Sequence, residues 1–401
     1  MAMPLDAAGV SREEAMAGLF TPFRLRQLVL PNRIVMAPMG RCFATDGVLA
    51  DGYADYFRKR VEGGVGLILG EASSVADEGS SNPTSPRFYG DAALEAWRAP
   101  IAAVHAAGGA FMPQIWHAGL ARAPGTDPFP DLPSIGPSDW YIPNTDEQLR
   151  PRPGHVYGNP MSESQIADVI ARFGEAAAHA QRLGADGVEI HGAHGYLIDQ
   201  FFWPTMNRRT DDYNGSLRDR TRFGAEVVRE IRRRTGADFP ILFRFSQWKL
   251  QDYDARTVNS PEEVADLVEP LAEAGVDLFH VSVRRFWEAA FTGSDLTLSG
   301  WTRKLSGLPT MTVGSITLDQ PFGVGTDDYA EHFTKADASQ HLDFSRPASM
   351  DRVLDLFAKG EFDLIAIGRA LLSNPDWARI VREGRFHDLK PYSRDVLGSL
   401  A

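Results

Sequence analysis

Two histidines and a tyrosine stand close together in the segment from Val188 to Leu197, which reads VEIHGAHGYL. His191 and His194 are three residues apart, and Tyr196 follows two residues later. At the end of a strand these side chains can converge on one small volume. Neutral imidazoles, or one imidazolium, can hydrogen-bond a carbonyl oxygen and stabilise developing enolate charge, and a phenol can donate a proton to carbon. The segment therefore predicts a site that activates and protonates a carbonyl compound.

The same histidines allow two other interpretations. A His-x-x-His spacing can chelate a metal ion, but no carboxylate convincingly completes the set. Glu189 would face the same side as His191 one layer deeper, and strand alternation leaves it far from His194. The histidines could instead be structural residues with satisfied hydrogen bonds. Gly192 and Gly195 favour the close approach of a ligand, so we expect a carbonyl-binding site without a metal.

Two further polar residues lie inside apolar runs that are typical of strands. Arg244 interrupts the run Ile-Leu-Phe-Arg-Phe, and an unpaired buried guanidinium is very costly. Its partner could be a negatively charged cofactor ring or a carboxylate on a neighbouring strand. Gln114 offers both a donor and an acceptor, which could bind a pyrimidine-like edge or satisfy backbone groups.

Small residues near the C-terminal end of the sequence indicate a phosphate site. Gly314 and Ser315 follow one apolar run, and Gly368 and Arg369 follow the next. Backbone N–H groups beside small residues can approach an anion, and an arginine can clamp it. We therefore predict a phosphate-bearing ligand, with ordinary glycine turns as the alternative.

The elements that must position these residues are eight short runs that alternate with longer helical patterns. Most runs are apolar on both faces, which favours parallel strands covered by helices. Eight strand–helix units predict a (β/α)₈ TIM barrel, whose active site lies at the C-terminal ends of the strands. An open doubly wound sheet is the alternative, weakened because no G-x-G-x-x-G follows the first strand. Capping boxes at Ser162–Gln165 and Ser260–Glu263 predict the starts of two helices. The expected strands are Arg33–Pro38, Gly66–Glu71, Phe111–Trp116, Gly187–His191, Ile241–Phe245, Leu278–Ser282, Thr310–Gly314 and Leu364–Gly368.

Residues 1–401 are expected to form a single domain. Residues 1–18 are interpreted as an N-terminal tail, and residues 19–33 as a small hairpin that leads into the barrel. Two long loop insertions are expected at residues 122–160 and 316–347. Long connections of this kind in a compact domain are usually functional or mobile.

Composition narrows the class of partner. The chain has 401 residues, with 41 basic against 53 acidic side chains and a net charge of −12, which disfavours nucleic acid. The sequence contains no apolar run of about 18 residues, so no membrane span is expected. Met1–Met16 does not resemble a secretory signal. A single cysteine excludes a disulfide framework within the chain, so we expect a cytoplasmic protein that binds small molecules.

From Leu19 to about Arg382 the chain resembles the Old Yellow Enzyme family of FMN-dependent oxidoreductases. Each marker is weak alone, but together and in order they are highly specific. The resemblance implies bound FMN, reduced by NADH or NADPH, that passes hydride to the β-carbon of an α,β-unsaturated carbonyl substrate. The markers are Leu19–Phe23, Pro31–Arg33, Ala37–Met39, Gly70–Ala72, Gln114–His117, His191–Leu197, Asn207–Tyr213, Phe243–Ser246, Val313–Ser315, Ile367–Arg369 and Asn374–Asp376.

Residue by residue, the resemblance implies a role for each candidate. Gln114 would bind the pyrimidine edge of the flavin, and Arg244 would face its N1/O2 region. His191 and His194 would bind the substrate carbonyl oxygen, and Tyr196 would protonate the α-carbon. The residues that would line the flavin ring are Pro38, Met39, Gly40 and Ala72. The residues that would hold the phosphate are Gly314, Ser315, Gly368 and Arg369.

Departures from the family pattern affect tuning and substrate choice. Gly40 stands where the family usually has threonine or cysteine, so a hydrogen bond to the flavin is lost and we expect a flavin that is harder to reduce. Bulky residues at Gln247–Lys249 and Phe286–Trp287 could narrow the substrate pocket. The alternatives are isomerisation or oxidative demethylation on the same fold, a metal-dependent hydrolase barrel, or a binding protein that keeps the fold. The oligomeric state is open, with a homodimer as one option.

Overall fold

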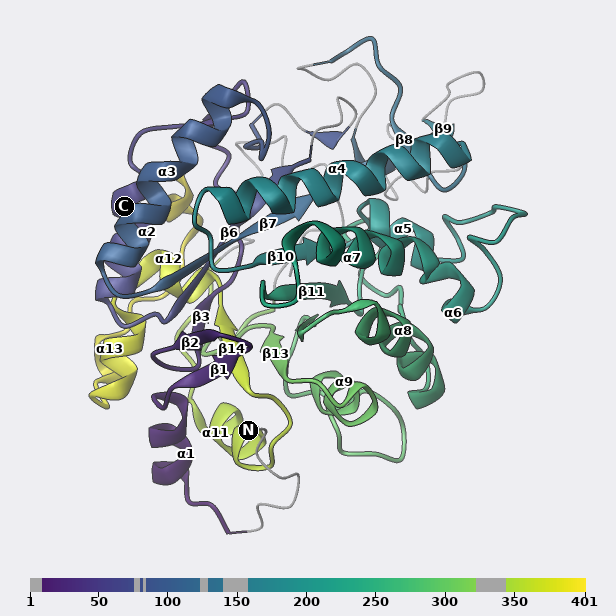
Figure 1. The fold of residues 1–401 in the computed structure, drawn as a ribbon. Coiled ribbons are helices and arrows are strands. Elements are labelled where there is room, and N and C mark those ends of the chain that lie inside the picture. Colours follow the sequence, from purple (N-terminus) through teal and green to yellow (C-terminus); the bar gives the residue numbers. More distant parts are fainter. Residues whose placement is uncertain (1–8, 76–79, 82–83, 123–128, 140–157, 322–343) are drawn as a thin grey trace.

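Eight parallel strands form a closed barrel at the centre of the molecule (Figure 1). The strands follow one another around the barrel in chain order, so the expected (β/α)₈ barrel is confirmed. The strands are β3 (Ile34–Met36), β6 (Leu67–Ser74), β7 (Ala110–Trp116), β10 (Val188–His191), β11 (Ile241–Ser246), β12 (Leu278–Ser282), β13 (Thr310–Val313) and β14 (Leu364–Ile367). The structure is a computed structural model that describes residues 9–75, 80–81, 84–122, 129–139, 158–321 and 344–401.

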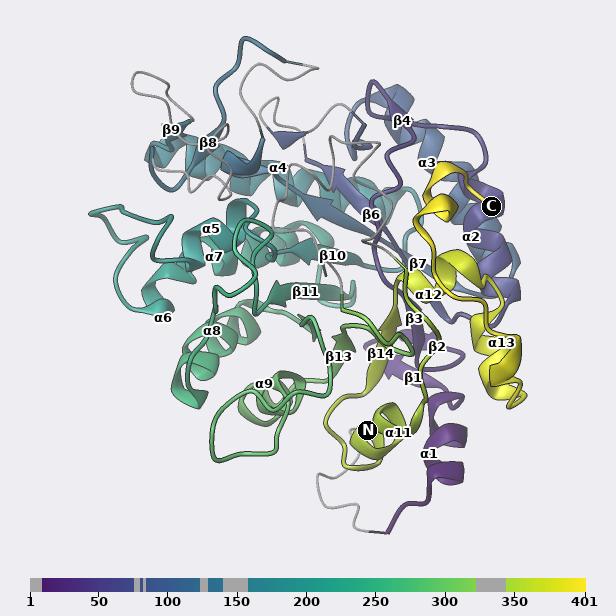
Figure 2. The ribbon, with the colours of Figure 1, turned by 180° about the vertical axis from the view of Figure 1, so that it is seen from behind.

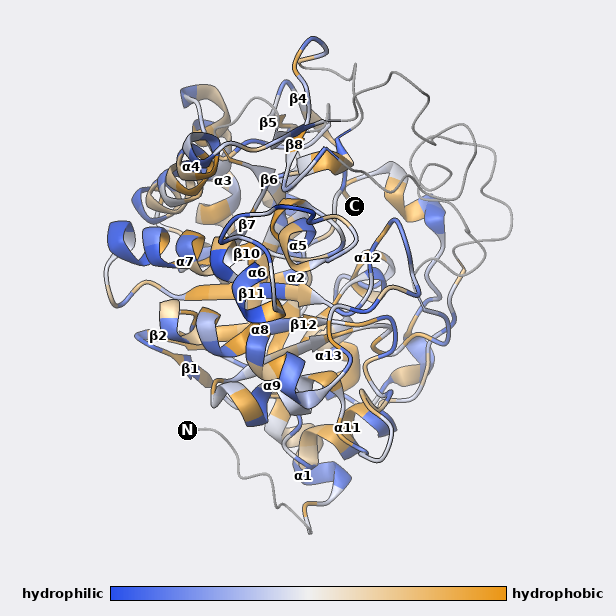
Figure 3. Cartoon of the chain, turned by 90° about the vertical axis from the view of Figure 1, so that its right-hand side faces the viewer, coloured by the Kyte–Doolittle hydropathy of each residue, from blue (hydrophilic) through white to orange (hydrophobic). Residues whose placement is uncertain are grey.

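Helices cover the outside of the barrel, as the two opposite views in Figures 1 and 2 show. Figure 3 shows hydrophobic residues concentrated on the strands and hydrophilic residues on the outer faces of helices such as α7. The main covering helices are α2 (Tyr53–Glu62), α3 (Asp91–Ala106), α4 (Glu163–Arg182), α7 (Arg222–Thr235), α8 (Pro261–Ala274), α9 (Leu298–Ser306), α11 (Asp351–Ala358) and α13 (Trp377–Arg382). The shorter helices are α5 (Leu197–Phe202), α6 (Leu217–Arg220) and α12 (Arg369–Ser373).

Both predicted helix starts are confirmed, and one of them differs in detail. Ser162 caps α4 through a reciprocal capping box with Gln165. Ser260 caps α8 by accepting a hydrogen bond from the Glu263 backbone N–H. The Glu263 carboxylate, however, accepts from the backbone N–H of Asn259 at 2.6 Å instead of returning to Ser260. The Glu263 carboxylate therefore bonds the backbone N–H of Asn259, one residue before the N-cap, in place of the Ser260 N–H that a capping box would use.

The barrel interior changes from apolar to polar along the strands. Because side chains alternate along a strand, inward positions recur every second residue. Met112 is thus followed by Gln114, Leu242 by Arg244 and Leu278 by His280 at the C-terminal end. The apolar layer at the other end contains Val35, Leu67, Leu69, Ala110, Met112, Leu242, Leu278, Met311, Leu364 and Ala366. Polar side chains therefore gather on β7, β10, β11 and β12, at the end of the barrel where the site is expected.

The segments before the barrel fold more than the sequence predicts. The hairpin expected within residues 19–33 is confirmed as β1 (Phe23–Leu25) and β2 (Leu28–Leu30), and its apolar side chains join the barrel interior. The expected tail is wrong in part, because Arg12–Leu19 forms helix α1, started by a capping box between Ser11 and Glu14.

The two expected loop insertions are described only in part. In the first, β8 (Ile135–Gly136) pairs in parallel with β9 (Asn159–Pro160). Near β3, β4 (Ala44–Thr45) and β5 (Val48–Leu49) form a small antiparallel pair. Residues 123–128, 140–157 and 322–343 lie outside the described residues. Within the described part of the chain, no helix is both long and apolar enough to span a membrane.

Candidate active site

The predicted histidine–tyrosine triplet converges at the C-terminal end of β10. The chain leaves the strand at His191, and a turn follows in which His194 and Gly195 adopt positive φ angles of 62° and 78°. The His191 ring centroid lies 5.2 Å from that of His194 and 5.0 Å from that of Tyr196. Trp116, at the end of β7, packs edge-on against Tyr196 at 5.1 Å. The three candidate side chains therefore share one small volume.

Both histidines are neutral in this environment. Burial lowers the pKa of His191 and of His194 well below the ordinary value, and the positive charge of Arg244 lowers both further. His191 Nδ1 accepts a hydrogen bond from the Ala193 backbone N–H at 3.3 Å, so its own N–H is at Nε2. His194 Nε2 lies 2.8 Å from Ser282 Oγ on β12. Each neutral ring retains one N–H that can serve a carbonyl oxygen.

The two glycines of the turn have a different role from the one expected. A Cβ on Gly192 would lie 2.5 Å from the Phe243 ring, and a Cβ on Gly195 would lie 1.9 Å from Gln251 Oε1. The close approach that requires glycine is therefore made by the protein's own β11 segment and not by a ligand. The glycines allow the turn to pack closely, which brings His194 over the end of β11.

Arg244 connects the centre of the barrel to the histidines. Its guanidinium lies 3.4 Å from Ser282 Oγ, the same hydroxyl that contacts His194. Among the described residues the Nε of Arg244 has no hydrogen-bond partner, although it is buried. The alternative interpretation, a salt bridge from Arg244 to a carboxylate on a neighbouring strand, is thus not observed in the described part of the chain. The orphaned donor leaves Arg244 able to bind an anionic or carbonyl-bearing group.

Gln114 has a side-chain partner that the sequence did not predict. Its amide Nε2 donates to Glu189 Oε1 at 2.7 Å, and His280 Nδ1 contacts Glu189 Oε2 at 2.6 Å. Glu189 and His280 are fully buried. His280 was missed by sequence reasoning, although a histidine at an inward position of the apolar run Leu278–Ser282 was the available signal.

The four residues expected at the phosphate lie on two neighbouring strand ends. Arg369 donates to the backbone oxygen of Gln320 at 2.7 Å and lies 3.3 Å from Ser315 Oγ. Gly314 must be glycine, because a Cβ there would lie 2.3 Å from the backbone oxygen of Val283. A Cβ on Gly368 would make only ordinary contacts, so the space beside it is open. The predicted grouping of Arg369 with Ser315 is observed, and phosphate binding stays a prediction.

The residues expected along the flavin ring leave room for a ligand. Nothing lies within 4 Å of a Cβ built on Gly40, and Met39 Sδ lies 3.7 Å from one built on Gly368. Ala72 is the Cα partner of Gln114, just after an irregularity in β6. Pro38 lies two residues past the end of β3. Open space beside small residues, together with the orphaned Arg244 Nε, fits a planar FMN ring whose N1/O2 edge becomes negative on reduction.

The bulky residues after β11 and β12 divide into two groups. Trp248 reaches the site, where its ring lies 4.5 Å from that of His194. Lys249 is fully buried in an ion pair with Asp199 at 2.5 Å, so it is not free to line a pocket. Phe286 packs against Phe362 in the hydrophobic cluster that the covering helices form with the outer faces of the strands. Only part of the expected narrowing, that from Trp248, is therefore seen beside the histidines.

Trp287, the last of these bulky residues, contacts Arg352 of α11 and likewise points away from the triplet.

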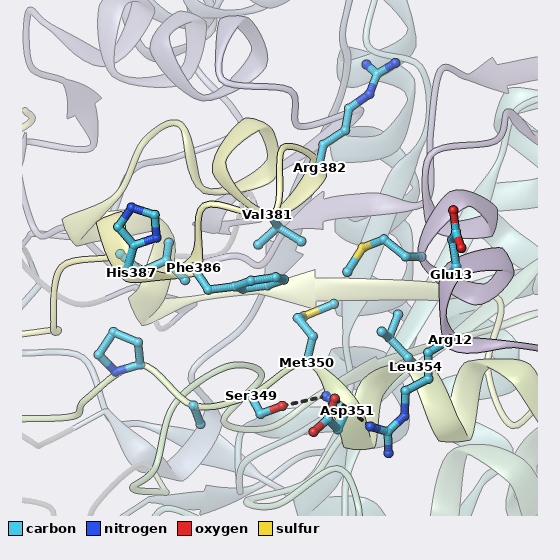
Figure 4. Close-up of a pocket in the computed structure, with 15 residues that line it drawn as sticks. Arg12, Glu13, Ser349, Met350, Asp351, Leu354, Val381, Arg382, Phe386 and His387 are labelled. Atoms are coloured by element: carbon cyan, nitrogen blue, oxygen red, sulfur yellow. Dashed lines mark hydrogen bonds and ion pairs between the residues drawn. The ribbon is translucent and has the colours of Figure 1, made fainter.

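No group of three His, Cys, Asp or Glu side chains in the described ranges is placed to hold a metal ion. A cavity of about 710 Å³ lies elsewhere, between α1, α11 and α13, with Arg12, Met350 and Phe386 in its lining (Figure 4). None of the predicted site residues lines this cavity.

Comparison with known proteins agrees with this geometry. The family model described as "NADH:flavin oxidoreductase / NADH oxidase family" matches residues 18–325. The NADH oxidase of Thermoanaerobacter brockii is 32% identical over 93% of this chain, which spans only 52% of that protein. 12-Oxophytodienoate reductase 7 of Oryza sativa subsp. japonica is 30% identical over 91% of this chain and 88% of its own length.

Solved structures show the same architecture. The old yellow enzyme homologue from Zymomonas mobilis has a TM-score of 0.74 and 25% identity, covering 95% of this chain and 96% of its own. Morphinone reductase in complex with tetrahydroNAD has a TM-score of 0.75 and 24% identity, covering 95% and 94%. The chain therefore belongs to the NADH:flavin oxidoreductase / NADH oxidase family, the family of the Old Yellow Enzymes, and is an oxidoreductase.

Proposed function

We propose that this protein is an FMN-dependent ene-reductase that acts on α,β-unsaturated carbonyl compounds. Bound FMN, reduced by NADH or NADPH, would supply hydride to the β-carbon of the substrate. The observation that carries the proposal is the convergence of His191, His194 and Tyr196 beside the polar edge formed by Gln114 and Arg244. The relatives named as reductases support a reduction as the net reaction.

In this proposal the two histidines hold the carbonyl oxygen. The Nε2–H of His191 donates to that oxygen. The Ser282 hydroxyl accepts a hydrogen bond from Arg244 and donates one to His194 Nε2. The N–H of the neutral His194 ring is therefore at Nδ1. Two neutral donors stabilise the enolate that develops as hydride arrives. Because their lowered pKa leaves both rings neutral, neither carries an imidazolium proton to give to the substrate, so protonation is left to another group.

Tyr196 is that group. Its ring packs between Trp116 and His191, and it is the residue that precedes the first turn of α5. The phenol would donate its proton to the α-carbon, and solvent would restore that proton after the product leaves. The proposed cofactor contacts are Pro38, Met39, Gly40 and Ala72 at the ring, Gln114 and Arg244 at its pyrimidine edge, and Gly314, Ser315, Gly368 and Arg369 at the phosphate.

Tyr196→Phe tests the proposal. We expect FMN reduction by NADPH or NADH to keep the wild-type rate, because no proton passes through Tyr196 in that half-reaction. Reoxidation by 2-cyclohexenone should slow by about 10²-fold or more, the usual contribution of a positioned general acid. Anaerobic stopped-flow absorbance of the flavin band, at roughly 450 nm in any oxidised flavin, measures both steps.

Tyr213→Phe is the matched control, because it removes a phenol that contacts Glu226 away from the triplet. Both half-reactions should be unchanged in this variant. A purified protein that binds no FMN would contradict the proposal as a whole. Two unaffected half-reactions in Tyr196→Phe would show that the proton donor is a different group. A yellow protein whose wild type barely reacts with enones would favour isomerisation or oxidative demethylation instead.

A further inference from the structure

We propose that Glu189 is a positioning residue of the cofactor site, which orients the amide of Gln114 and supplies the buried counter-charge of Arg244. This inference rests on the proposed function, because it concerns the edge at which FMN would bind. Glu189 lies one inward layer below His191 on β10, and its Cα partners across the neighbouring strands are Gln114 and Leu242. It is therefore beneath the polar end of the barrel interior.

The first step concerns which end of the Gln114 amide faces upward. A carboxylate only accepts hydrogen bonds, so the 2.7 Å contact with Glu189 must be made by the amide nitrogen. The amide oxygen is then turned toward the remaining space. Gln114 thus presents an acceptor and one remaining N–H, the complement of a ring edge that carries an N–H beside a carbonyl. Without Glu189 the amide could rotate by 180° at little cost.

The second step concerns what holds Glu189. His280 Nδ1 contacts its other oxygen at 2.6 Å, from a strand two places further round the barrel. Burial lowers the pKa of His280, and Arg244 lowers it further against the attraction of Glu189. A neutral His280 must carry its proton at Nδ1 to donate to the carboxylate, so it holds Glu189 in place without cancelling its charge.

The third step concerns charge. Burial lowers the pKa of the Arg244 guanidinium, and the Glu189 carboxylate opposes this shift. The other titratable groups that face Arg244 are His191, His194 and His280, and their lowered pKa values leave them neutral. Glu189 is therefore the negative charge that balances Arg244. That charge disfavours the anionic, reduced form of a flavin bound beside Arg244.

Two substitutions separate position from charge. Glu189→Gln keeps the length of the side chain, so its oxygen can accept from Gln114 and its nitrogen can donate to the other His280 tautomer, but the charge is lost. Glu189→Asp keeps the charge, but the side chain is shorter by one methylene and cannot reach both partners. The first variant isolates the counter-charge and the second isolates the orientation of the amide.

The readouts are the midpoint potential of bound FMN, from anaerobic dye-equilibrated titration, and the FMN dissociation constant, from flavin fluorescence on the apoprotein. Glu189→Gln should shift the oxidised–reduced equilibrium at least tenfold toward reduced flavin, which is about 30 mV for a two-electron couple, with unchanged FMN affinity. Glu189→Asp should keep the wild-type potential and bind FMN at least tenfold more weakly.

Asp363→Asn is the matched control. Asp363 is a buried carboxylate that pairs with Arg303 at 3.1 Å, at the opposite end of the barrel before β14. The same loss of charge there should leave the potential and the FMN affinity unchanged. A wild-type potential in Glu189→Gln, or an equal shift in Asp363→Asn, would overturn the charge role. Wild-type affinity in Glu189→Asp would overturn the positioning role, and this arm decides alone if the glutamine variant does not fold.

The proposed function fails in a different way. A wild-type protein that takes up no FMN would contradict the ene-reductase proposal before any variant is made. A wild-type protein that binds and reduces FMN normally, with both Glu189 variants indistinguishable from it, would contradict only the inference about Glu189.

Discussion

Gly40 is a residue whose side chain is missing where the structure has room for one. A Cβ at this position would meet nothing within 4 Å, and the backbone does not require glycine. Gly40→Thr should therefore fold normally and place a hydroxyl beside the proposed flavin ring. Because a donor near the ring favours the reduced, more negative form, we expect a more positive midpoint potential of bound FMN than in the wild type.

Gly40→Val is the control for this substitution, since valine has the shape of threonine without the hydroxyl. Potentiometric titration of both variants checks the expectation. An equal shift in the valine variant would assign the effect to packing and not to hydrogen bonding. A wild-type potential already equal to or above that of relatives with threonine would contradict the expected role of Gly40.

At the scale of single residues, the direction of a side chain could be predicted better than its partner. Alternation along β10 places His191 and Glu189 on the inward side, and the structure agrees. The bonds of Glu189 to Gln114 and His280 could not be predicted, because those partners are 75 and 91 residues distant in the chain. Their meeting depends on the register between strands, which a single strand does not encode.

At the scale of elements, the turn from β10 to α5 depends on a buried ion pair. Asp199 in α5 accepts from the Gly195 backbone N–H at 2.7 Å and pairs with Lys249, which also donates to Thr257 at 2.6 Å. Burial raises the pKa of Asp199 and lowers that of Lys249. The pair thus ties the turn that carries His194 to the segment after β11.

Lys249→Met should destabilise the protein by about 3–5 kcal/mol, because it leaves the Asp199 carboxylate buried without its partner. Urea unfolding monitored by circular dichroism gives the free energy of unfolding. The double variant Asp199→Asn/Lys249→Met should recover much of the loss, since both charges are removed and asparagine still accepts from Gly195. A double variant as unstable as the single one would show that packing, and not the charge, makes Lys249 important.

The elements themselves were largely predictable where local signals are strong. All eight barrel strands were expected within a few residues, since runs apolar on both faces recur between helical patterns. β6 extends to Ser74 past its predicted end at Glu71, because its register with β7 shifts between Leu69 and Ala72. That irregularity arises from strand pairing, so it leaves no periodic trace in the segment.

At the scale of the whole molecule, the last residues of the chain are bound to the loop after β3 and to α2. Arg41, in the loop after β3, donates to the backbone oxygens of Val396 and Ser399, the latter at 2.7 Å. Arg60 of α2 donates to Ala401 at 3.1 Å, and Figures 1 and 2 both show the C-terminus beside α2. The loop that carries Gly40 therefore depends on contacts from the last residues.

Glu71, a buried residue of β6, fixes this loop and should make stability depend on pH. Its carboxylate accepts from the Arg41 backbone N–H at 2.6 Å and from the Tyr53 hydroxyl. Burial nevertheless raises the pKa of Glu71 from its ordinary 4.5 to about 7. Between these two values the folded protein binds more protons than the unfolded chain, so the free energy of unfolding falls as pH rises.

The fall should begin near pH 4.5, end near pH 7 and amount to roughly 3–4 kcal/mol at most, since one pKa unit corresponds to about 1.4 kcal/mol. Urea unfolding of the wild type and of Glu71→Gln across this range isolates the contribution, because other groups titrate equally in both. Their difference should change with pH only inside this window. Tyr53→Phe removes a bond that lowers the pKa of Glu71, so it should extend the window upward. A constant difference between wild type and Glu71→Gln would mean that Glu71 stays ionised when folded, and that the loop is held by a charged carboxylate at every pH.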